Sequence, residues 1–106
     1  MKVYVWFMKV RYEDTGLAII ETDSAHKTKL PTEVVLSARR KIRFMRDAKD
    51  IRDLRNWRSL HFEKLNNHPD GNYSIRINIQ WRIIFDIDTN CQPNEIIINS
   101  IKDYHQ

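Results

Sequence analysis

The sequence of 106 residues contains only one cysteine, two glycines and three prolines. Because Cys91 has no partner, no disulfide can form within the chain, and such cysteine usage is typical of a reducing cytoplasm. So few glycines and prolines exclude long flexible linkers and low-complexity segments. The apolar stretch at residues 3–8 is closed by Lys9 and Arg11, too soon for a secretory signal or a membrane span. We therefore expect a cytoplasmic protein with no membrane partner and a single domain over residues 1–106.

The charge of the chain is unevenly distributed. Hydrophobic residues make up 42% and charged residues 30%, which is typical of a globular protein, and the net charge of +4 favours polyanions as partners. Spacings of four residues, as in Arg43/Asp47, Arg46/Asp50 and Lys49/Asp53, favour a solvated helix face, although some cations remain for an acidic partner or rRNA. Nine of the 18 basic residues lie in one stretch: Arg39, Arg40, Lys41, Arg43, Arg46, Lys49, Arg52, Arg55 and Arg58.

The first half of the chain has helical patterns. Glu13–Thr15 opens a short helix that runs through Ile20, and a polar loop follows at residues 22–30. Pro31 then starts a longer helix, and a short turn or helix through Ile51 and Leu54 leads to Trp57. The longer helix has apolar residues at helical spacing, namely Val34, Val35, Ala38, Ile42 and Met45.

The second half has strand patterns. Apolar residues alternate with polar ones from Tyr73 to Ile79 and again from Trp81 to Asp88, with a tight hairpin expected at Ile79-Gln80. A turn cluster then precedes a strand rich in isoleucine at residues 95–101. This order predicts an α+β fold in which two N-terminal helices pack on a small, mainly antiparallel twisted sheet.

Polar residues of these strands suggest a site that binds an anion and transfers protons. Arg76 and Arg82 flank the hairpin on its polar side, and two neighbouring arginines are best tolerated where an anion binds. Neutralisation by Asp86, Asp88 or Glu63 is the structural alternative. The last strand ends in Lys102, Asp103, Tyr104 and His105, so that an acid, a phenol and an imidazole follow a buried strand beside a basic sheet. This combination suggests proton transfer next to a bound anion.

The remaining histidines are weaker signals. His61 and His68, each taken alone, are typical of surface or capping residues. A zinc site built from Cys91, His61, His68 and His105 is disfavoured because no pair has the spacing of metal ligands. We therefore expect neither a metal nor another cofactor.

Three segments together resemble the HigB (host-inhibition-of-growth) toxins of the RelE/ParE superfamily. These segments are Tyr73–Asn78, Gln80–Phe85 and Asp103–His105. The resemblance covers residues 8–105. Arg11-Tyr12 before Gly16-Leu17 is similar to the opening strand and first helix of that family, and Leu60-His61 with Lys64 is similar to its Leu-His-x-x-Lys segment.

The resemblance implies a metal-independent endoribonuclease that cuts mRNA in the ribosomal A site. It also implies a cognate HigA-like antitoxin with a helix-turn-helix domain, and contact with operator DNA only through the toxin–antitoxin complex. The residues that match the RNA-binding and cleaving positions of the family, together with the neighbouring Lys102, are His61, Lys64, Arg76, Arg82, Lys102, Asp103, Tyr104 and His105.

These residue types suit RNA cleavage by the 2′-hydroxyl, which needs a base, an acid and cations around the phosphate. We assign acid or base catalysis to His105, oriented or assisted by Asp103. We assign stabilisation of the phosphate to three cations, Arg76, Arg82 and Lys64. Nucleotide stacking or hydrogen bonding is assigned to Tyr104 and His61, and further RNA contact to Lys102.

Two segments depart from the family pattern. The loop Leu65–Gly71 lacks the Lys-Gly-Asp-Arg type of sequence and so offers less charge to RNA. Residues 1–7 precede the usual family start, either as an extension of the first strand or because an upstream start codon was chosen.

Two other functions stay open at this stage. A ParE-like relative would inhibit DNA gyrase without cleaving RNA, although it has no need of the Asp103-Tyr104-His105 end. A non-catalytic nucleic-acid-binding module would use the basic helix with Trp57, Tyr73 and Trp81. However, Tyr73 and Trp81 fall on the apolar strand face and are expected in the core.

Overall fold

The computed structural model describes residues 7–91 and 93–104, and the statements below concern these residues. Helices dominate the first half of the chain and strands the second. The elements are β1 (Lys9–Tyr12), α1 (Thr15–Ala18), η1 (Ile19–Glu21), η2 (Ala25–Thr28), α2 (Thr32–Asp47), α3 (Ile51–Asn56), η3 (Arg58–Leu60), β2 (Glu63–Lys64), β3 (Tyr73–Arg76), β4 (Trp81–Asp88) and β5 (Glu95–Asp103).

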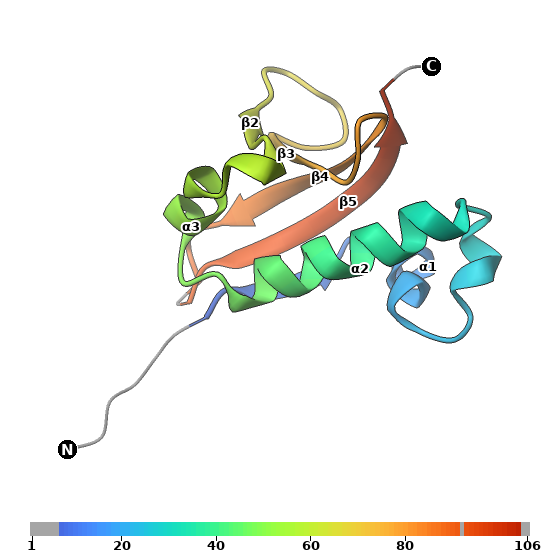
Figure 1. The fold of residues 1–106 in the computed structure, drawn as a ribbon. Helices are drawn as coiled ribbons and strands as arrows, with labels where there is room; N and C mark the ends of the chain where they lie inside the picture. The colour runs from blue at the N-terminus through green and yellow to red at the C-terminus, as the bar shows by residue number, and fades with distance from the viewer. Residues whose placement is uncertain (1–6, 92, 105–106) are drawn as a thin grey trace.

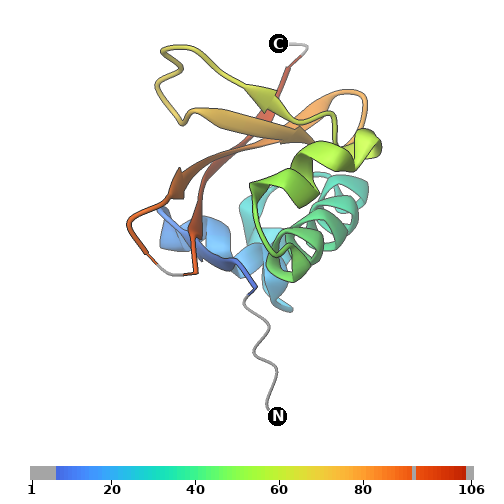
Figure 2. The same cartoon turned by 90° about the vertical axis from the view of Figure 1, so that its left-hand side faces the viewer.

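The strands form one twisted sheet in the order β1-β5-β4-β3-β2 (Figure 1). All neighbouring pairs are antiparallel except β1 and β5, which run parallel. Helices α2 and α3 lie on one side of this sheet, so the molecule has two layers (Figure 2). The predicted α+β fold is therefore confirmed, and the short turn or helix expected through Ile51 and Leu54 is helix α3.

Helix α2 supplies the helical half of the core. Pro31 stands at its N-cap, where a residue without an amide hydrogen costs nothing. The five apolar positions predicted from periodicity are all buried, and they pack with sheet residues such as Ile75, Phe85 and Ile98. Because this stripe is continuous over about three turns, the hydrophobic effect fixes which face of α2 meets the sheet.

Helix α1 is short and begins where the sequence predicts. The side chain of Asp14 accepts a hydrogen bond from the backbone N–H of Gly16 at 2.8 Å, a usual N-cap arrangement. The 3-10 helix η1 continues α1 and buries Ile20. The predicted polar loop at residues 22–30 contains a second 3-10 helix, η2.

The hairpin between β3 and β4 differs from the prediction. Strand β3 ends at Arg76, and four residues separate it from β4, so the expected strand through Ile79 is wrong. Asn78 Oδ1 accepts hydrogen bonds from the N–H groups of Gln80 and Trp81 at 2.9 and 2.8 Å. This side-chain turn replaces the ladder and leaves Ile79 82% exposed.

The basic stretch also pairs differently from the prediction. Helix α2 ends at Asp47, so Arg46/Asp50 and Lys49/Asp53 do not share one helix, and no ion pair joins Arg43 to Asp47. Arg46 instead forms a two-fold hydrogen bond with Glu21, which also accepts a hydrogen bond from Tyr12 at 2.7 Å. Asp50 pairs with Arg52 at 3.0 Å. The predicted four-residue ion pairs are therefore wrong: the helix stops before Asp50 and Asp53, and Arg43 and Asp47 form no ion pair although both lie in α2.

The face of the sheet away from α2 is covered in part by the loop between β2 and β3. Asn72 N–H donates to Asp86 at 2.8 Å, and Lys102 pairs with Asp70 at 2.9 Å. Gly71 has φ +149°, and a Cβ there would lie 3.0 Å from the carbonyl oxygen of Phe85, so only glycine fits this approach. This loop thus seals Ile84, which is fully buried.

The N-terminal segment is described only from Phe7 onward, and Met8 is buried against the core. The expectation of an extension over residues 1–7 therefore falls almost entirely outside the described residues. No helix in the described part of the chain is long and apolar enough to cross a membrane.

Candidate functional site

Three cations form a row across the sheet on the face away from α2. Arg76 of β3 stands opposite Arg82 of β4, which in turn stands opposite Lys102 of β5. Side chains paired across antiparallel strands share a face, so three positive charges gather near one end of the sheet. The predicted closeness of Arg76 and Arg82 is confirmed.

Arg82 is the buried member of this row, with 6% of its surface exposed. Its Nε donates to Ser74 Oγ at 2.9 Å, and a terminal nitrogen donates to the carbonyl oxygen of His61. The Glu63 carboxylate lies 3.7 Å away. A buried guanidinium is stable only when its donors are satisfied, as they are here.

The three acidic residues that could neutralise these arginines have different partners. Glu63 approaches Arg82, whereas Asp86 accepts hydrogen bonds from Asn72 and Asn99. Asp88 accepts from the Asn90 N–H instead. Arg82 is thus neutralised in part by Glu63, and Arg76 has no carboxylate partner among the described residues.

His61 connects Arg76 with Arg82. Its backbone is left-handed, with φ 45°, because it ends the 3-10 helix η3. A non-glycine residue is rare in this conformation, and the bond from Arg82 to its carbonyl oxygen helps to hold it. The ring Nε2 lies 3.2 Å from a terminal nitrogen of Arg76. Since a guanidinium only donates, this contact is a hydrogen bond when the imidazole accepts at Nε2.

Tyr104 closes the cluster from the end of β5. The guanidinium carbon of Arg82 lies 5.5 Å from the centre of its ring, a cation–π contact, and 43% of the residue remains exposed. Its backbone N–H donates to the carbonyl oxygen of Gln80 at 2.8 Å. The ring therefore has one face on Arg82 and an accessible surface for a flat ligand.

Asp103 stands beside Tyr104 but on the other face of β5. It pairs in register with Trp81, and its carboxylate accepts a hydrogen bond from Gln80 Nε2 at 2.7 Å. Alternation along the strand separates it from Lys102, whose ammonium pairs with Asp70. The hydrogen bond from Lys102 holds the pKa of the Asp70 carboxyl below its usual range. His105 lies outside the described residues.

Lys64 is not brought into the cluster. It is exposed on the edge strand β2 and pairs with Tyr73, whose ring packs toward the core. Alternation therefore assigns Lys64 to the face of Tyr73, opposite to Ser74 and Arg76. The sequence interpretation missed Ser74 as an anchor, although a small hydroxyl two positions before Arg76 on the same face was the available signal.

The other ionisable groups do not add a metal centre. Within residues 7–91 and 93–104, no group of three His, Cys, Asp or Glu side chains could hold a metal ion. Cys91 is exposed, and the neighbouring Asp88 carboxylate raises the pKa of its thiol, which disfavours a reactive thiolate.

The α+β fold with its five-stranded, mostly antiparallel sheet is consistent with that of RelE-like toxins. The family model of the RelE-like toxin of type II toxin–antitoxin system HigB matches residues 10–105. The chain therefore belongs to the HigB-like toxin family, as the sequence resemblance predicted. Membership implies an antitoxin as partner. No curated protein and no solved structure gives a significant match to the chain.

Proposed function

We propose that this toxin is an endoribonuclease that cleaves mRNA on the ribosome and thereby stops translation. The observation that carries the proposal is the meeting of His61, Arg76, Arg82 and Tyr104 on one sheet face, from segments far apart in the sequence. Together they offer an imidazole, a cation with no carboxylate partner among the described residues and an accessible aromatic ring, which are groups that bind a nucleotide and its phosphate.

The proposed reaction is attack of the ribose 2′-hydroxyl on the adjacent phosphorus. A base takes the proton of the 2′-hydroxyl as the new P–O bond forms, and an acid protonates the 5′-oxygen as its bond to phosphorus breaks. The products are a 2′,3′-cyclic phosphate and a 5′-hydroxyl. No metal is required if cations of the protein stabilise the extra negative charge of the transition state.

The residues differ in the contacts that hold them. Arg76 is partly exposed, and among the described residues its side chain is held by the hydrogen bond to His61 alone, so it can turn toward a phosphate at small cost. Arg82 is fixed by Ser74 and His61. It contributes positive potential, and the Tyr104 ring packs on its guanidinium. Tyr104 stacks on the nucleotide, and Lys102 and Lys64 attract the RNA strand from the periphery.

His105 supplies acid or base catalysis in this proposal, and Asp103 orients it or shares the proton transfer. The sequence places His105 directly after Tyr104, at the end of the strand that carries the cluster. An imidazole has an unperturbed pKa near neutrality, which suits it to exchange protons at the pH of a cell.

The proposed partners follow from the family. A HigA-like antitoxin with a helix-turn-helix domain silences the toxin, and operator DNA is contacted only through the complex. The ribosome presents the mRNA, and the cytoplasm is the compartment in which both are found.

Induced expression with mapping of mRNA 5′ ends tests this function. We expect wild type to arrest growth and to create new in-frame 5′ ends within translated codons. His105→Ala should lose most of both effects while remaining folded, because only the proton-transfer group is removed. His26→Ala is the matched control, since His26 is an exposed histidine outside the cluster.

Two results would contradict the proposal. A fully toxic His105→Ala protein would remove His105 from the mechanism. Growth arrest with intact mRNA, unaffected by the substitution, would instead favour gyrase or another protein as the target.

A further inference from the structure

Strand β5 is longer than the strand beside it. It has nine residues, whereas β1 has four, and their pairing covers only Glu95–Ile98 of β5. The last hydrogen bond on this side runs from the N–H of Glu13 to the carbonyl oxygen of Ile98, at 2.9 Å, before the chain turns into α1. Among the described residues, no strand pairs with Asn99–Lys102 on that side.

The backbone of this segment offers hydrogen-bonding groups to the open side. The N–H of Tyr104 points to β4, where it bonds to Gln80, so alternation turns Lys102 toward β4 as well. Ile101, between them, therefore presents its N–H and C=O to the open side. An unpaired stretch of this kind is a template for an added strand.

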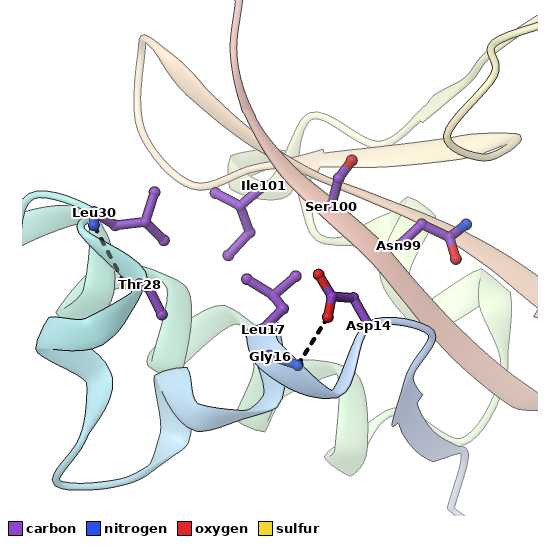
Figure 3. A pocket seen from close by; sticks show the side chains of 8 residues that line it. All are labelled: Asp14, Gly16, Leu17, Thr28, Leu30, Asn99, Ser100 and Ile101. Atoms are coloured by element: carbon purple, nitrogen blue, oxygen red, sulfur yellow. Dashed lines mark hydrogen bonds between the residues drawn. The ribbon is translucent and has the colours of Figure 1, made fainter.

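A cavity of about 300 Å³ lies along this open edge (Figure 3). One wall is β5 at Asn99–Ile101, and the other consists of α1 and the end of the loop before α2. Figure 3 shows Ile101 and Leu17 pointing toward each other across the cavity, with the Asp14 carboxylate beside them. The cavity is thus large enough for a side chain and lined by both apolar and acidic groups.

Carboxylates surround this edge although the chain as a whole carries a net charge of +4. One oxygen of Asp14 accepts from Gly16 N–H, and the other has no donor among the described residues. A second hollow, on the other side of β5, is lined by Glu13, Asp70 and Asp86, of which Glu13 lies 3.6 Å from Arg11 and Asp70 pairs with Lys102. The remaining Asp14 oxygen therefore makes the cavity complementary to a cationic side chain.

We propose that the edge Asn99–Lys102 of β5 binds an extended, basic segment of the cognate antitoxin, which adds to the sheet beyond the end of β1. Main-chain hydrogen bonds would supply affinity, and alternate side chains would supply specificity. A side chain with an apolar stem and a cationic end fits the cavity, because its stem meets Leu17 and Ile101 and its charge meets Asp14.

This inference rests on the proposed toxin–antitoxin function and adds its regulation. Strand β5 ends at Asp103, directly after the edge segment, and the next residue is Tyr104 of the candidate site. An antitoxin strand paired with β5 would hold that end of the sheet in one conformation. It would also place part of the antitoxin beside the exposed surface of the Tyr104 ring. The antitoxin would thus regulate the candidate site by binding next to it.

Residue-resolved amide exchange of the isotope-labelled toxin, alone and in its complex with the cognate antitoxin, tests the proposal. We expect the Ile101 amide to become protected in the complex. Asp14→Asn keeps a good N-cap residue and so should fold, but we expect about a threefold to tenfold increase in the Kd of the complex. Asp47→Asn, an exposed carboxylate at the C-terminal end of α2, is the matched control and should leave the Kd unchanged.

The outcomes separate the possibilities. A neutralising complex in which the Ile101 amide exchanges as in the free toxin, or equal affinity of Asp14→Asn and wild type, overturns the docking site. Concentration-dependent protection of Ile101 in the toxin alone, with the mass of a dimer, would assign the edge to a second copy and also overturn it. RNA cleavage by the free toxin is measured separately, so failure of the ribonuclease activity is distinguishable from failure of the docking site.

Discussion

At the scale of single residues, the two arginines of the cluster have different surroundings and should have different roles. Arg82 is buried and bonded to Ser74 and His61, whereas the partly exposed Arg76 side chain bonds, within the described part of the chain, only to the His61 ring. A lysine cannot reproduce the two divergent bonds of a buried guanidinium. Stability should therefore depend on Arg82, and activity on both, with Arg76 acting at the phosphate.

We predict that Arg82→Lys lowers the free energy of unfolding by about 1–3 kcal/mol, since Ser74 and the His61 carbonyl lose their donors. Arg76→Ala should change it by less than about 1 kcal/mol and still abolish most RNA cleavage. Urea denaturation of both variants, alongside a cleavage assay, measures the two effects. An unchanged unfolding midpoint in Arg82→Lys would contradict the structural role.

The sequence predicted that Arg76 and Arg82 lie close together, because a period of two residues and a hairpin determine which side chains share a face. It did not predict that Arg82 is buried. That burial depends on residues 61–63 returning to the sheet, a long-range contact with no local pattern. For the same reason the sequence did not show that Lys64 belongs to the opposite face from Arg76.

At the scale of elements, the hairpin after β3 depends on one side chain. Asn78→Ala should lower the free energy of unfolding by about 1–2 kcal/mol, because the N–H groups of Gln80 and Trp81 both lose the Oδ1 acceptor. Asn78→Asp keeps an acceptor oxygen and should retain most of the stability. Denaturation and amide exchange at Gln80 test this, and equal stability of Asn78→Ala and wild type would refute it.

The contact between η1 and α2 should be sensitive to acid. Hydrogen bonds from Arg46 hold the pKa of Glu21 below its ordinary value of 4.5. A depressed folded-state pKa stabilises the fold above the unfolded-state pKa, and this stabilisation is lost as the pH falls through the folded-state pKa. Wild type should therefore lose stability below about pH 4.5 more steeply than Glu21→Gln, by roughly 1 kcal/mol for this partly exposed pair. Parallel pH profiles of unfolding would contradict this role of Glu21.

Helices and strands were predicted correctly where apolar spacing or a capping residue determines them. They were predicted wrongly where a polar side chain or a distant segment takes over the contacts. The apolar stripe of α2 and the N-cap at Asp14 were both predictable from spacing and residue type. The end of β3 was not, since the alternation continues through Ile79 while the Asn78 side chain takes over the backbone donors. The pairing of Arg46 with Glu21 was likewise hidden, because the partners are 25 residues apart.

At the scale of the whole molecule, the exposed cations of α2 and α3 suit contact with ribosomal RNA. Arg40 and Arg43 are exposed, and neither forms an ion pair with a described residue. Arg40→Gln and Arg43→Gln should each weaken ribosome binding and lower the slope of log affinity against log salt by about 0.7–0.9 if each contacts one phosphate. Arg52→Gln is the control, because Arg52 already pairs with Asp50. Unchanged ribosome co-sedimentation in the Arg40 and Arg43 variants would exclude this surface.

The sequence predicted the fold class because helices precede an antiparallel meander in the chain. The parallel placement of β1 beside β5 was not predictable, since it joins the two ends of the chain and leaves no local signal. The half-open edge of β5 follows from that placement. The strand register is needed to locate this edge, since β1 pairs only with Glu95–Ile98 of the nine-residue β5.

The proposed ribonuclease activity can be tested with purified components, by adding the toxin to ribosomes programmed with a defined mRNA and mapping the cut by primer extension. We predict a cut within a codon of the ribosome-bound message, with a 5′-hydroxyl on the downstream fragment, and no cut with His105→Ala. If the message stays intact with a wild-type toxin that arrests growth in cells, the toxin does not act by cleaving ribosome-bound mRNA.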